Sequence, residues 1–349
     1  MASRERVTLR EVAAAAGVSV MTVSYAFNNP GRVAESTRLK VVEVAERLGF
    51  RGPDAGARQL RLRGGLRSLG LVLGESLDYI FDDPEATRFV AGIARECTRA
   101  GFGLTFLPTT GTADDVELIA SAAVDAFIVW TTTPDDVSLA AVRDSHRPAV
   151  IHGGPAAEGF TLVSIDNRSA AEALAMEVWS GGSHPAVLCF PLDRSRDAGT
   201  HYGIDPQSVA FPVSRDRLAG CQDAAQALGI DWQRIPIIVC AHNSAEEGRD
   251  RVTSLLGTGA PVDGIVSMSD QLAVGAMEAL KSLDLPVPQD VTVGGFDDSV
   301  PAREWELTTV HQSLLDQGAR AARIALGVEK PGSKQDEWRL IRRRSSFRL

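Results

Sequence analysis

The stretch from Val7 to Leu48 constrains this chain more than any other, because it carries the start and stop signals of three short helices. Thr8 followed three residues later by Glu11 is a capping-box pair, which predicts the start of the first helix, and Gly17 predicts its end. Ser19 is placed to cap a second helix after a short turn. This spacing is that of a helix-turn-helix unit.

The second and third predicted helices each have an apolar inner face. Val23 and Phe27 point inward from the second helix. In the third helix, between about residues 35 and 48, the predicted inner stripe consists of Val41, Val44, Ala45 and Leu48. The outer face of the second helix then carries Val20, Met21, Ser24 and Tyr25.

Charge separates this end of the chain from the rest. Residues 1–67 hold twelve Lys and Arg against six Asp and Glu, a net charge of +6 in a chain of −9, which leaves −15 on the remainder. A basic end attracts phosphates, and an acidic body resists wrapping by nucleic acid. A helix-turn-helix unit places its second helix in the major groove of DNA. A three-helix unit that binds nothing is the alternative, but it would not explain the charge, so the sequence predicts double-stranded DNA as a partner.

Several motifs resemble the lactose-repressor (LacI/GalR) family. VTLREVAAAAGVSVMTVSYAFN, RVAESTRLKV, AERLGF and ARQLR resemble its DNA-binding headpiece and hinge. DRLAG, SDQLAVGAMEAL, VPQDVTVGGFDD and LTTVHQ resemble its effector-binding body, so the match runs, with gaps, over nearly the whole chain. The resemblance implies a transcriptional regulator, usually a repressor, that acts as a homodimer on a near-palindromic operator and is switched by a small molecule.

Two groups of headpiece residues are expected to contact the DNA. The outer face of the second helix (Val20, Met21, Ser24 and Tyr25) should meet base edges, with apolar contacts such as those to thymine methyls. Tyr25 stands where many family members have an arginine, and it lacks the paired donors that read guanine. Phosphate contacts are expected from Thr8, Ser19, Thr22, Asn28 and Arg32.

Residues 51–67 form the predicted linker between headpiece and body. In the family this segment is a hinge helix whose leucine wedges into the minor groove, and Leu60 occupies that position here, with Arg58 beside it to contact phosphate. Gly56 weakens a helix, so a flexible basic tether is the alternative.

The length of 349 residues suits a small headpiece, residues 1–50, and a larger body, residues 68–349. Short apolar runs alternate with amphipathic helices along the body, which predicts an α/β fold with parallel sheets. Nine strand candidates exceed one comfortable sheet, so we expect two lobes. By resemblance the body is periplasmic-binding-protein-like, with one lobe at about 68–163 and 307–329 and the other at about 164–306 and 330–349. The strand candidates are 69–73, 103–107, 126–130, 149–152, 162–165, 186–190, 236–240, 264–268 and 291–295.

The effector is expected in a cleft between the lobes, where the carboxyl ends of the strands face each other. Arg217 and Asp270 match family positions that contact the effector, and Gly153 stands where many members have an aspartate. For each candidate the alternative is a surface charge or a helix cap. A sugar or sugar derivative is the first expectation and a nucleoside or other small polar metabolite the second. The candidate residues are Ser76, Asp78, Tyr79, Phe81, Trp130, Thr131, Arg217, Asp270 and Asp297.

Other features limit the remaining classes. No dinucleotide, Walker, zinc-protease or nucleophile-elbow motif is present, which argues against an enzyme, and no cofactor is expected. The four cysteines have no metal or redox spacing and are expected to be buried free thiols in a reducing cytoplasm.

An exported solute receptor is disfavoured by the missing signal region. Residues 193–211 are an insertion, either a loop over the cleft or a surface excursion. Too few residues follow a last strand candidate at 338–344 for a heptad tail, which favours a dimer.

Overall fold

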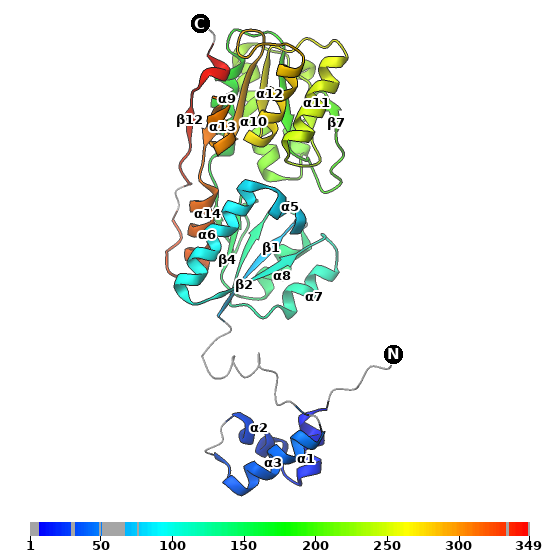
Figure 1. Ribbon diagram of the computed structural model, residues 1–349, viewed down its shortest axis with the longest axis vertical. Coiled ribbons are helices and arrows are strands. Elements are labelled where there is room, and N and C mark those ends of the chain that lie inside the picture. Colours follow the sequence, from blue (N-terminus) through cyan, green and yellow to red (C-terminus); the bar gives the residue numbers. More distant parts are fainter. Residues whose placement is uncertain are drawn as a thin grey trace. The chain divides into compact units, whose positions relative to one another are not determined.

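The computed structural model describes residues 7–28, 32–48, 50, 67–74, 77–332 and 335–347. The chain forms two compact units, residues 1–67 and 68–349 (Figure 1). The linker residues Arg58 and Leu60, and Ser76 in the body, lie outside the described residues, as do the side chains of Asn28, Asp78 and Tyr79.

The first unit is the three-helix headpiece, with helices α1 (Leu9–Ala16), α2 (Val20–Asn28) and α3 (Glu35–Leu48). Thr8 and Glu11 form the expected capping box, and Gly17 ends α1 in the left-handed conformation with φ 65°. The hydroxyl of Ser19 accepts from the backbone N–H of Thr22 at the start of α2. The core consists of Val12, Ala13, Ala16, Val23, Ala26, Val41, Val44 and Ala45.

Leu48 departs from the predicted stripe of α3, because it is 38% exposed. It is the last residue of its helix, and the chain beyond it covers the core instead. Phe50 packs on the headpiece core, and its ring meets that of Phe27 edge-on, with the ring centroids 5.8 Å apart. The prediction for Leu48 was therefore wrong, since helix periodicity takes no account of a following residue that folds back.

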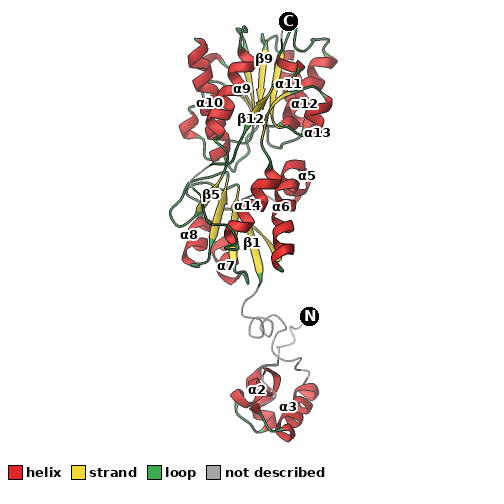
Figure 2. Ribbon diagram, turned by 90° about the vertical axis from the view of Figure 1, so that its left-hand side faces the viewer, coloured by secondary structure: helices red, strands yellow, loops and turns green. Residues whose placement is uncertain are grey.

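The first lobe of the body contains a five-stranded parallel sheet in the order β2-β1-β3-β4-β5. Helices α6 and α14 share a core cluster on one face of the sheet, and α7 and α8 cover the other face (Figure 2). The strands are β1 (Ser68–Leu73), β2 (Gly103–Pro108), β3 (Ala126–Trp130), β4 (Ala149–His152) and β5 (Thr161–Val163). The helices are α5 (Leu77–Asp82), α6 (Pro84–Ala100), α7 (Asp114–Ser121), α8 (Val137–Asp144) and α14 (Leu314–Ala325).

The second lobe contains a seven-stranded sheet in the order β12-β11-β10-β9-β6-β8-β7, parallel except for its two edge strands. Helices α9 and α10 cover one face and α11 and α12 the other. The strands are β6 (Pro185–Cys189), β7 (Gly199–His201), β8 (Ile237–Val239), β9 (Gly264–Ser267), β10 (Thr292–Asp297), β11 (Thr308–His311) and β12 (Arg339–Ile341). The helices are α9 (Asn167–Trp179), α10 (Pro212–Leu228), α11 (Ala245–Gly257), α12 (Asp270–Ser282) and α13 (Val300–Glu304), with short 3-10 turns at 206–208, 232–234 and 344–346.

The α/β class with a three-helix headpiece and two largely parallel lobes is thus confirmed, but one boundary was wrong. The chain does not return to the first lobe near residue 307, because β11 pairs with β10 in the second lobe and the return begins with α14. The reason lies in Thr308 and Thr309, which are buried with their hydroxyls hydrogen-bonded to the Arg343 carbonyl and the Asp270 carboxylate. A search for apolar runs does not find such a strand.

Two smaller expectations concern the insertion and the cysteines. Within residues 193–211, the segment 199–201 is β7, an edge strand antiparallel to β8. The four cysteines are buried free thiols, as expected. Among the described residues, no helix is long and apolar enough to cross a membrane.

Candidate functional sites

The outer face of α2 is the candidate DNA-reading surface. Met21 is 65% exposed and Val20 is also exposed, although both are apolar. Tyr25 is half-buried, and the guanidinium of Arg32 lies over its ring, 5.8 Å from the centroid. Exposed apolar side chains on a helix next to a basic group suit contact with base edges and phosphate. Their contacts with DNA remain predictions.

A cavity between the two lobes is the candidate effector site. Both sheets contribute the carboxyl ends of their strands: Trp130 ends β3, His152 ends β4 and Asp297 ends β10. The residues at the start of α6 and α10 complete the wall. Such an edge is where ligands of open α/β sheets bind.

Arg217 of α10 is a fixed cation in this wall. Its side chain is 4% exposed, and its Nε donates to Asn167 Oδ1 at 2.9 Å while Nη1 donates to the Met268 carbonyl. The guanidinium lies over the ring of Phe296, 3.9 Å from its centroid. Burial lowers the pKa of Arg217 to about 10, so the group stays charged at neutral pH.

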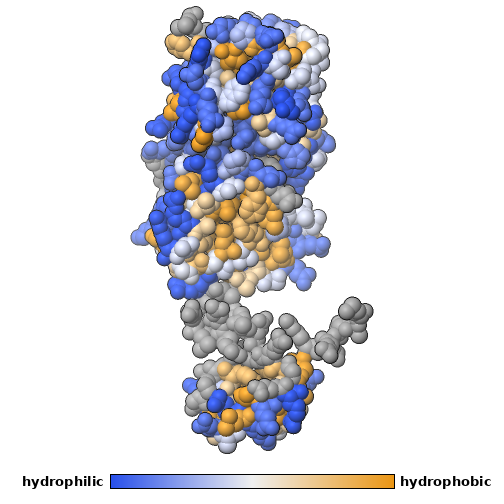
Figure 3. Space-filling model, viewed as in Figure 1, coloured by the Kyte–Doolittle hydropathy of each residue, from blue (hydrophilic) through white to orange (hydrophobic). Residues whose placement is uncertain are grey.

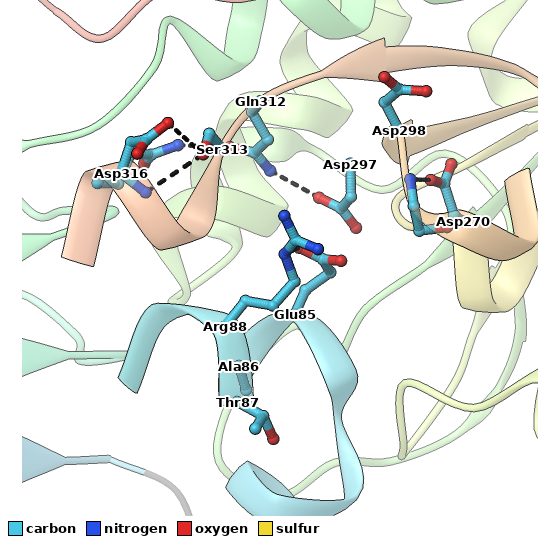
Figure 4. A network of polar contacts seen from close by, with 12 residues as sticks. Glu85, Ala86, Thr87, Arg88, Asp270, Asp297, Asp298, Gln312, Ser313 and Asp316 are labelled. Carbon is cyan, nitrogen blue, oxygen red and sulfur yellow. Dashed lines mark hydrogen bonds and ion pairs between the residues drawn. The ribbon is translucent and has the colours of Figure 1, made fainter. Parts of the chain in front are cut away.

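Acidic side chains also line the cavity. Asp297 accepts from Gln312 Nε2 at 2.8 Å, and Glu85 of α6 points toward Asp297 (Figure 4). Burial, and next the charge of Asp297, raise the pKa of Glu85 to about 8. Burial also raises the pKa of Asp297 to about 6, against the opposing effect of Arg217. With Asp83 also in the lining, an anion bound here would meet three carboxyl groups.

Asp270 lies outside the cavity lining. Its Oδ1 accepts from the Thr309 hydroxyl at 2.6 Å and its Oδ2 from the Ser299 backbone N–H at 2.8 Å. Burial raises the pKa of Asp270 to about 7. The structure therefore does not bring Asp270 and Arg217 together as a ligand-facing pair. Asp297 holds the position facing the cavity, while Asp270 ties α12 to neighbouring elements.

The other predicted residues divide into two groups. Trp130 and Thr131 line the cavity. Phe81 does not, because it is 61% exposed and packs against Phe106 of the edge strand β2, with ring centroids 6.0 Å apart.

Sequence reasoning missed several lining residues, above all Glu85, His152 and Gln312. His152 ends the strand candidate at 149–152, so the rule that ligands bind at strand ends could have found it. Glu85 and Gln312 carried no such signal, because they enter the site from a helix start and from a crossover between the lobes.

Two polar contacts join the lobes in this structure. Asn243 of the second lobe donates to Asp83 of the first at 2.8 Å. Arg194, from the insertion at residues 193–211, forms an ion pair with the buried Asp136 of the first lobe. The insertion is therefore a bridge between the lobes rather than a surface excursion.

The buried carboxyls predict that the body loses stability as the pH rises from 6.5 to 8. Glu85, Asp270 and Asp297 have pKa values raised to about 8, 7 and 6, so in this window the folded state binds more protons than the unfolded state. Their stabilising contribution is complete below the unfolded values near 4 and disappears as the pH passes the folded values. The lowered pKa of His152, about 4, has the opposite effect, but this effect is small above pH 6.5, where the unfolded imidazole is at most half protonated. Thermal unfolding at pH 6.5, 7.2 and 8.0 should show a midpoint temperature that falls as the pH rises.

Glu85→Gln should flatten this fall and raise the midpoint at pH 8, because it removes the group with the most elevated pKa of the three. Glu246→Gln, at an exposed position of α11, is the matched control and should leave the slope unchanged. An equal midpoint at all three pH values in the wild type would contradict the prediction.

Comparison with known proteins gives two family matches. Residues 8–52 match the model described as bacterial regulatory proteins, lacI family, and residues 197–346 match a periplasmic binding protein-like domain. An HTH-type transcriptional regulator of Mycobacterium tuberculosis is 34% identical over 334 residues, which cover 94% of this chain and 93% of that protein.

Solved structures show the same architecture. A LacI-family transcriptional regulator from Corynebacterium glutamicum aligns with a TM-score of 0.73 and 27% identity, over 99% of this chain and all of that one. A complex of the regulator CelR with cellobiose (TM-score 0.65, 23% identity) covers 97% of this chain and all of that one. The lac repressor dimer bound to operator and an anti-inducer (TM-score 0.65, 22% identity) covers 99% of this chain and all of that one. These last two likenesses show the fold alone.

Proposed function

The chain belongs to the LacI family of bacterial regulatory proteins and is a DNA-binding transcriptional regulator, and on this premise we propose that it is a repressor controlled by a small polar effector bound between its lobes. The relatives are transcriptional regulators, a class of proteins that are not enzymes. The proposal assigns operator reading to the outer face of α2 and effector binding to the cavity around Arg217.

The cavity chemistry supports an uncharged polyhydroxy effector, such as a sugar or sugar derivative. A carboxylate accepts hydrogen bonds from hydroxyl groups, and Asp297, with a pKa of about 6, is ionised in the wall at neutral pH. Glu85 beside it, with a pKa of about 8, is a protonated carboxyl group that can both donate to and accept from a hydroxyl group. Trp130 and Phe190 offer apolar surface for a sugar ring. A phosphorylated ligand would meet the acidic wall, while Arg217 already donates to Asn167 and the Met268 carbonyl. A nucleoside is the second candidate, because a flat base also stacks on Trp130.

The names of two fold relatives support the two halves of this proposal. One is a complex with cellobiose, and the other is a dimer bound to its operator. In the proposed mechanism, the effector binds more tightly to one arrangement of the two lobes than to the other. It thereby shifts the fraction of the protein that is competent to bind DNA.

A homodimer through the body is part of the proposal. β2 is an edge strand of the first lobe, and an apolar patch covers this region in Figure 3. Phe81 and Leu77 of α5 are exposed beside it. An open strand edge with apolar neighbours is a typical place for contact with another chain. Two headpieces related by two-fold symmetry would read a near-palindromic site.

Selection of binding sites from random DNA tests the operator-reading role. Tyr25→Ala should change the selected sequence, because the proposal assigns Tyr25 to contact with base edges. Arg32→Ala should keep the selected sequence but weaken binding to all DNA and flatten the salt dependence by about one unit, because a phosphate contact carries no sequence information.

Thermal unfolding of the full chain should show the headpiece transition at the wild-type temperature in both variants, which controls for folding of the unit that carries the substitutions. If the wild type selects no sequence, the function as an operator-binding regulator is wrong. If Tyr25→Ala selects the wild-type sequence, only the role of Tyr25 is wrong.

A further inference from the structure

His152 is a buried polar side chain at the wall of the cavity. It ends β4, is 7% exposed and lines the cavity. Its ring packs against Phe89, with centroids 4.4 Å apart, and lies edge-on to Trp130 at 6.4 Å. Burial lowers the pKa of His152 to about 4, so the imidazole is neutral at physiological pH.

A chain of three hydrogen bonds joins His152 to Asp297 across the two lobes. His152 Nε2 lies 2.8 Å from Gln317 Oε1, Gln317 Nε2 lies 3.1 Å from Gln312 Oε1, and Gln312 Nε2 lies 2.8 Å from Asp297 Oδ1. Gln312 lies between β11 and α14, where the chain crosses from the second lobe to the first. The chain of bonds therefore follows this crossover.

The charge of Asp297 sets the direction of every bond in this chain. With its pKa at about 6, Asp297 is ionised at pH 7.5, and an ionised carboxylate only accepts hydrogen bonds. Gln312 must then turn its amide N–H₂ toward Asp297 and its oxygen toward Gln317. Gln317 in turn presents its oxygen to His152, so His152 Nε2 carries the proton and Nδ1 is left as a bare acceptor.

This bare acceptor has no partner among the described residues, although it is buried. A buried acceptor without a donor costs about 1–3 kcal/mol, so a group from the cavity side is favoured as its partner. The next residue is Gly153, at the position where the resemblance to the family leads one to expect a carboxylate that accepts from a sugar hydroxyl. The neutral ring of His152 is thus placed to supply an acceptor that the sequence lacks at 153.

We propose that His152 Nδ1 accepts a hydrogen bond from a hydroxyl group of the effector, and that Asp297, Gln312 and Gln317 act as positioning residues that fix the tautomer of His152. The proposal rests on the proposed function, because it assumes a polyhydroxy effector in this cavity. The proposal also predicts which effectors the site prefers. An analogue in which this hydroxyl group is replaced by hydrogen binds more weakly than the effector itself.

Nuclear magnetic resonance of the full chain labelled with ¹⁵N at its six histidines tests the tautomer without a ligand. At pH 7.5 the His152 signals, assigned from their loss in His152→Asn, should show a protonated Nε2 and an unprotonated Nδ1. D-glucose, D-galactose, maltose and cellobiose are then titrated in separate samples. A sugar that binds should shift the Nδ1 signal in the direction expected for a newly accepted hydrogen bond.

Two variants separate the two nitrogens. Asparagine places its oxygen near the position of histidine Nδ1, whereas glutamine reaches only the position of Nε2. His152→Gln should therefore weaken sugar binding by about tenfold to a hundredfold, and His152→Asn by clearly less. His242→Gln, at an exposed histidine paired with Glu247, is the control and should bind as the wild type does.

The outcomes of these experiments test the tautomer of His152 and its contact with the effector separately. A proton on Nδ1 in the free protein overturns the tautomer, and an unshifted Nδ1 signal in a sugar-bound sample, or equal losses in both variants, overturns the contact. If none of the four sugars binds, the proposed effector class is wrong and this inference falls with it. Binding with an unaffected His152, in contrast, overturns this inference alone.

Discussion

Arg217→Ala is expected to weaken effector binding by about a hundredfold or more, while operator binding by the ligand-free protein stays unchanged. The guanidinium of Arg217 is buried between the Met268 carbonyl, Asn167 and the ring of Phe296, and it faces the cavity. Removing it leaves Asp297 without its neighbouring cation and leaves two buried acceptors without a donor. A buried polar group that is left without its hydrogen-bond partner costs about 1–3 kcal/mol, and more when the group is charged.

Calorimetry with the sugar that binds the wild type, in parallel with operator binding, measures both effects. Arg215→Ala is the matched control, because Arg215 lies on the same helix but pairs with the adjacent Asp216 and does not line the cavity. Thermal unfolding shows whether Arg217→Ala is folded at the assay temperature. If folded Arg217→Ala retains the wild-type affinity, the effector binds elsewhere.

Gly275→Ala is expected to lower the free energy of unfolding of the body by about 3 kcal/mol. Gly275 lies in α12, where it faces α11, and a Cβ there would approach the Ala245 carbonyl oxygen to 2.1 Å and the Arg249 nitrogen to 2.7 Å. Both contacts are with backbone, so no side chain can move aside. The two helices must separate, which disrupts the packing of Leu255 and Leu272 in the same core cluster.

Urea unfolding followed by far-ultraviolet circular dichroism measures this loss. Gly257→Ala is the matched control, since Gly257 ends α11 and a Cβ there meets no atom within 4 Å. That substitution should be neutral or stabilise by up to about 1 kcal/mol, because alanine favours helix. Equal stability of the two variants would show that α11 and α12 are not held at the distance seen here.

The headpiece and the class of the body were determined by the sequence itself. The capping box of Thr8 and Glu11 and the left-handed Gly17 are signals between residues close in the chain, so they can be read without knowing the fold. The apolar strands of a parallel sheet are equally legible, because burial on both faces demands continuous apolar runs. The motifs that resemble the family fixed Arg217 as a candidate, and the structure places it in the cavity wall.

Only the tertiary structure decided which polar residues share the cavity. Asp270 lies in a family motif, but both of its oxygens accept hydrogen bonds from Thr309 and Ser299. Glu85 reaches the cavity from the first turn of α6, whose capping residues Asp83 and Pro84 indicate a helix start and not a ligand site. His152 and Gln317 meet although 165 residues separate them. Local signals record the propensity of a residue and its near neighbours. The pairing of buried polar groups depends on which distant elements come together, and each such group is stable only when the other supplies its hydrogen bond.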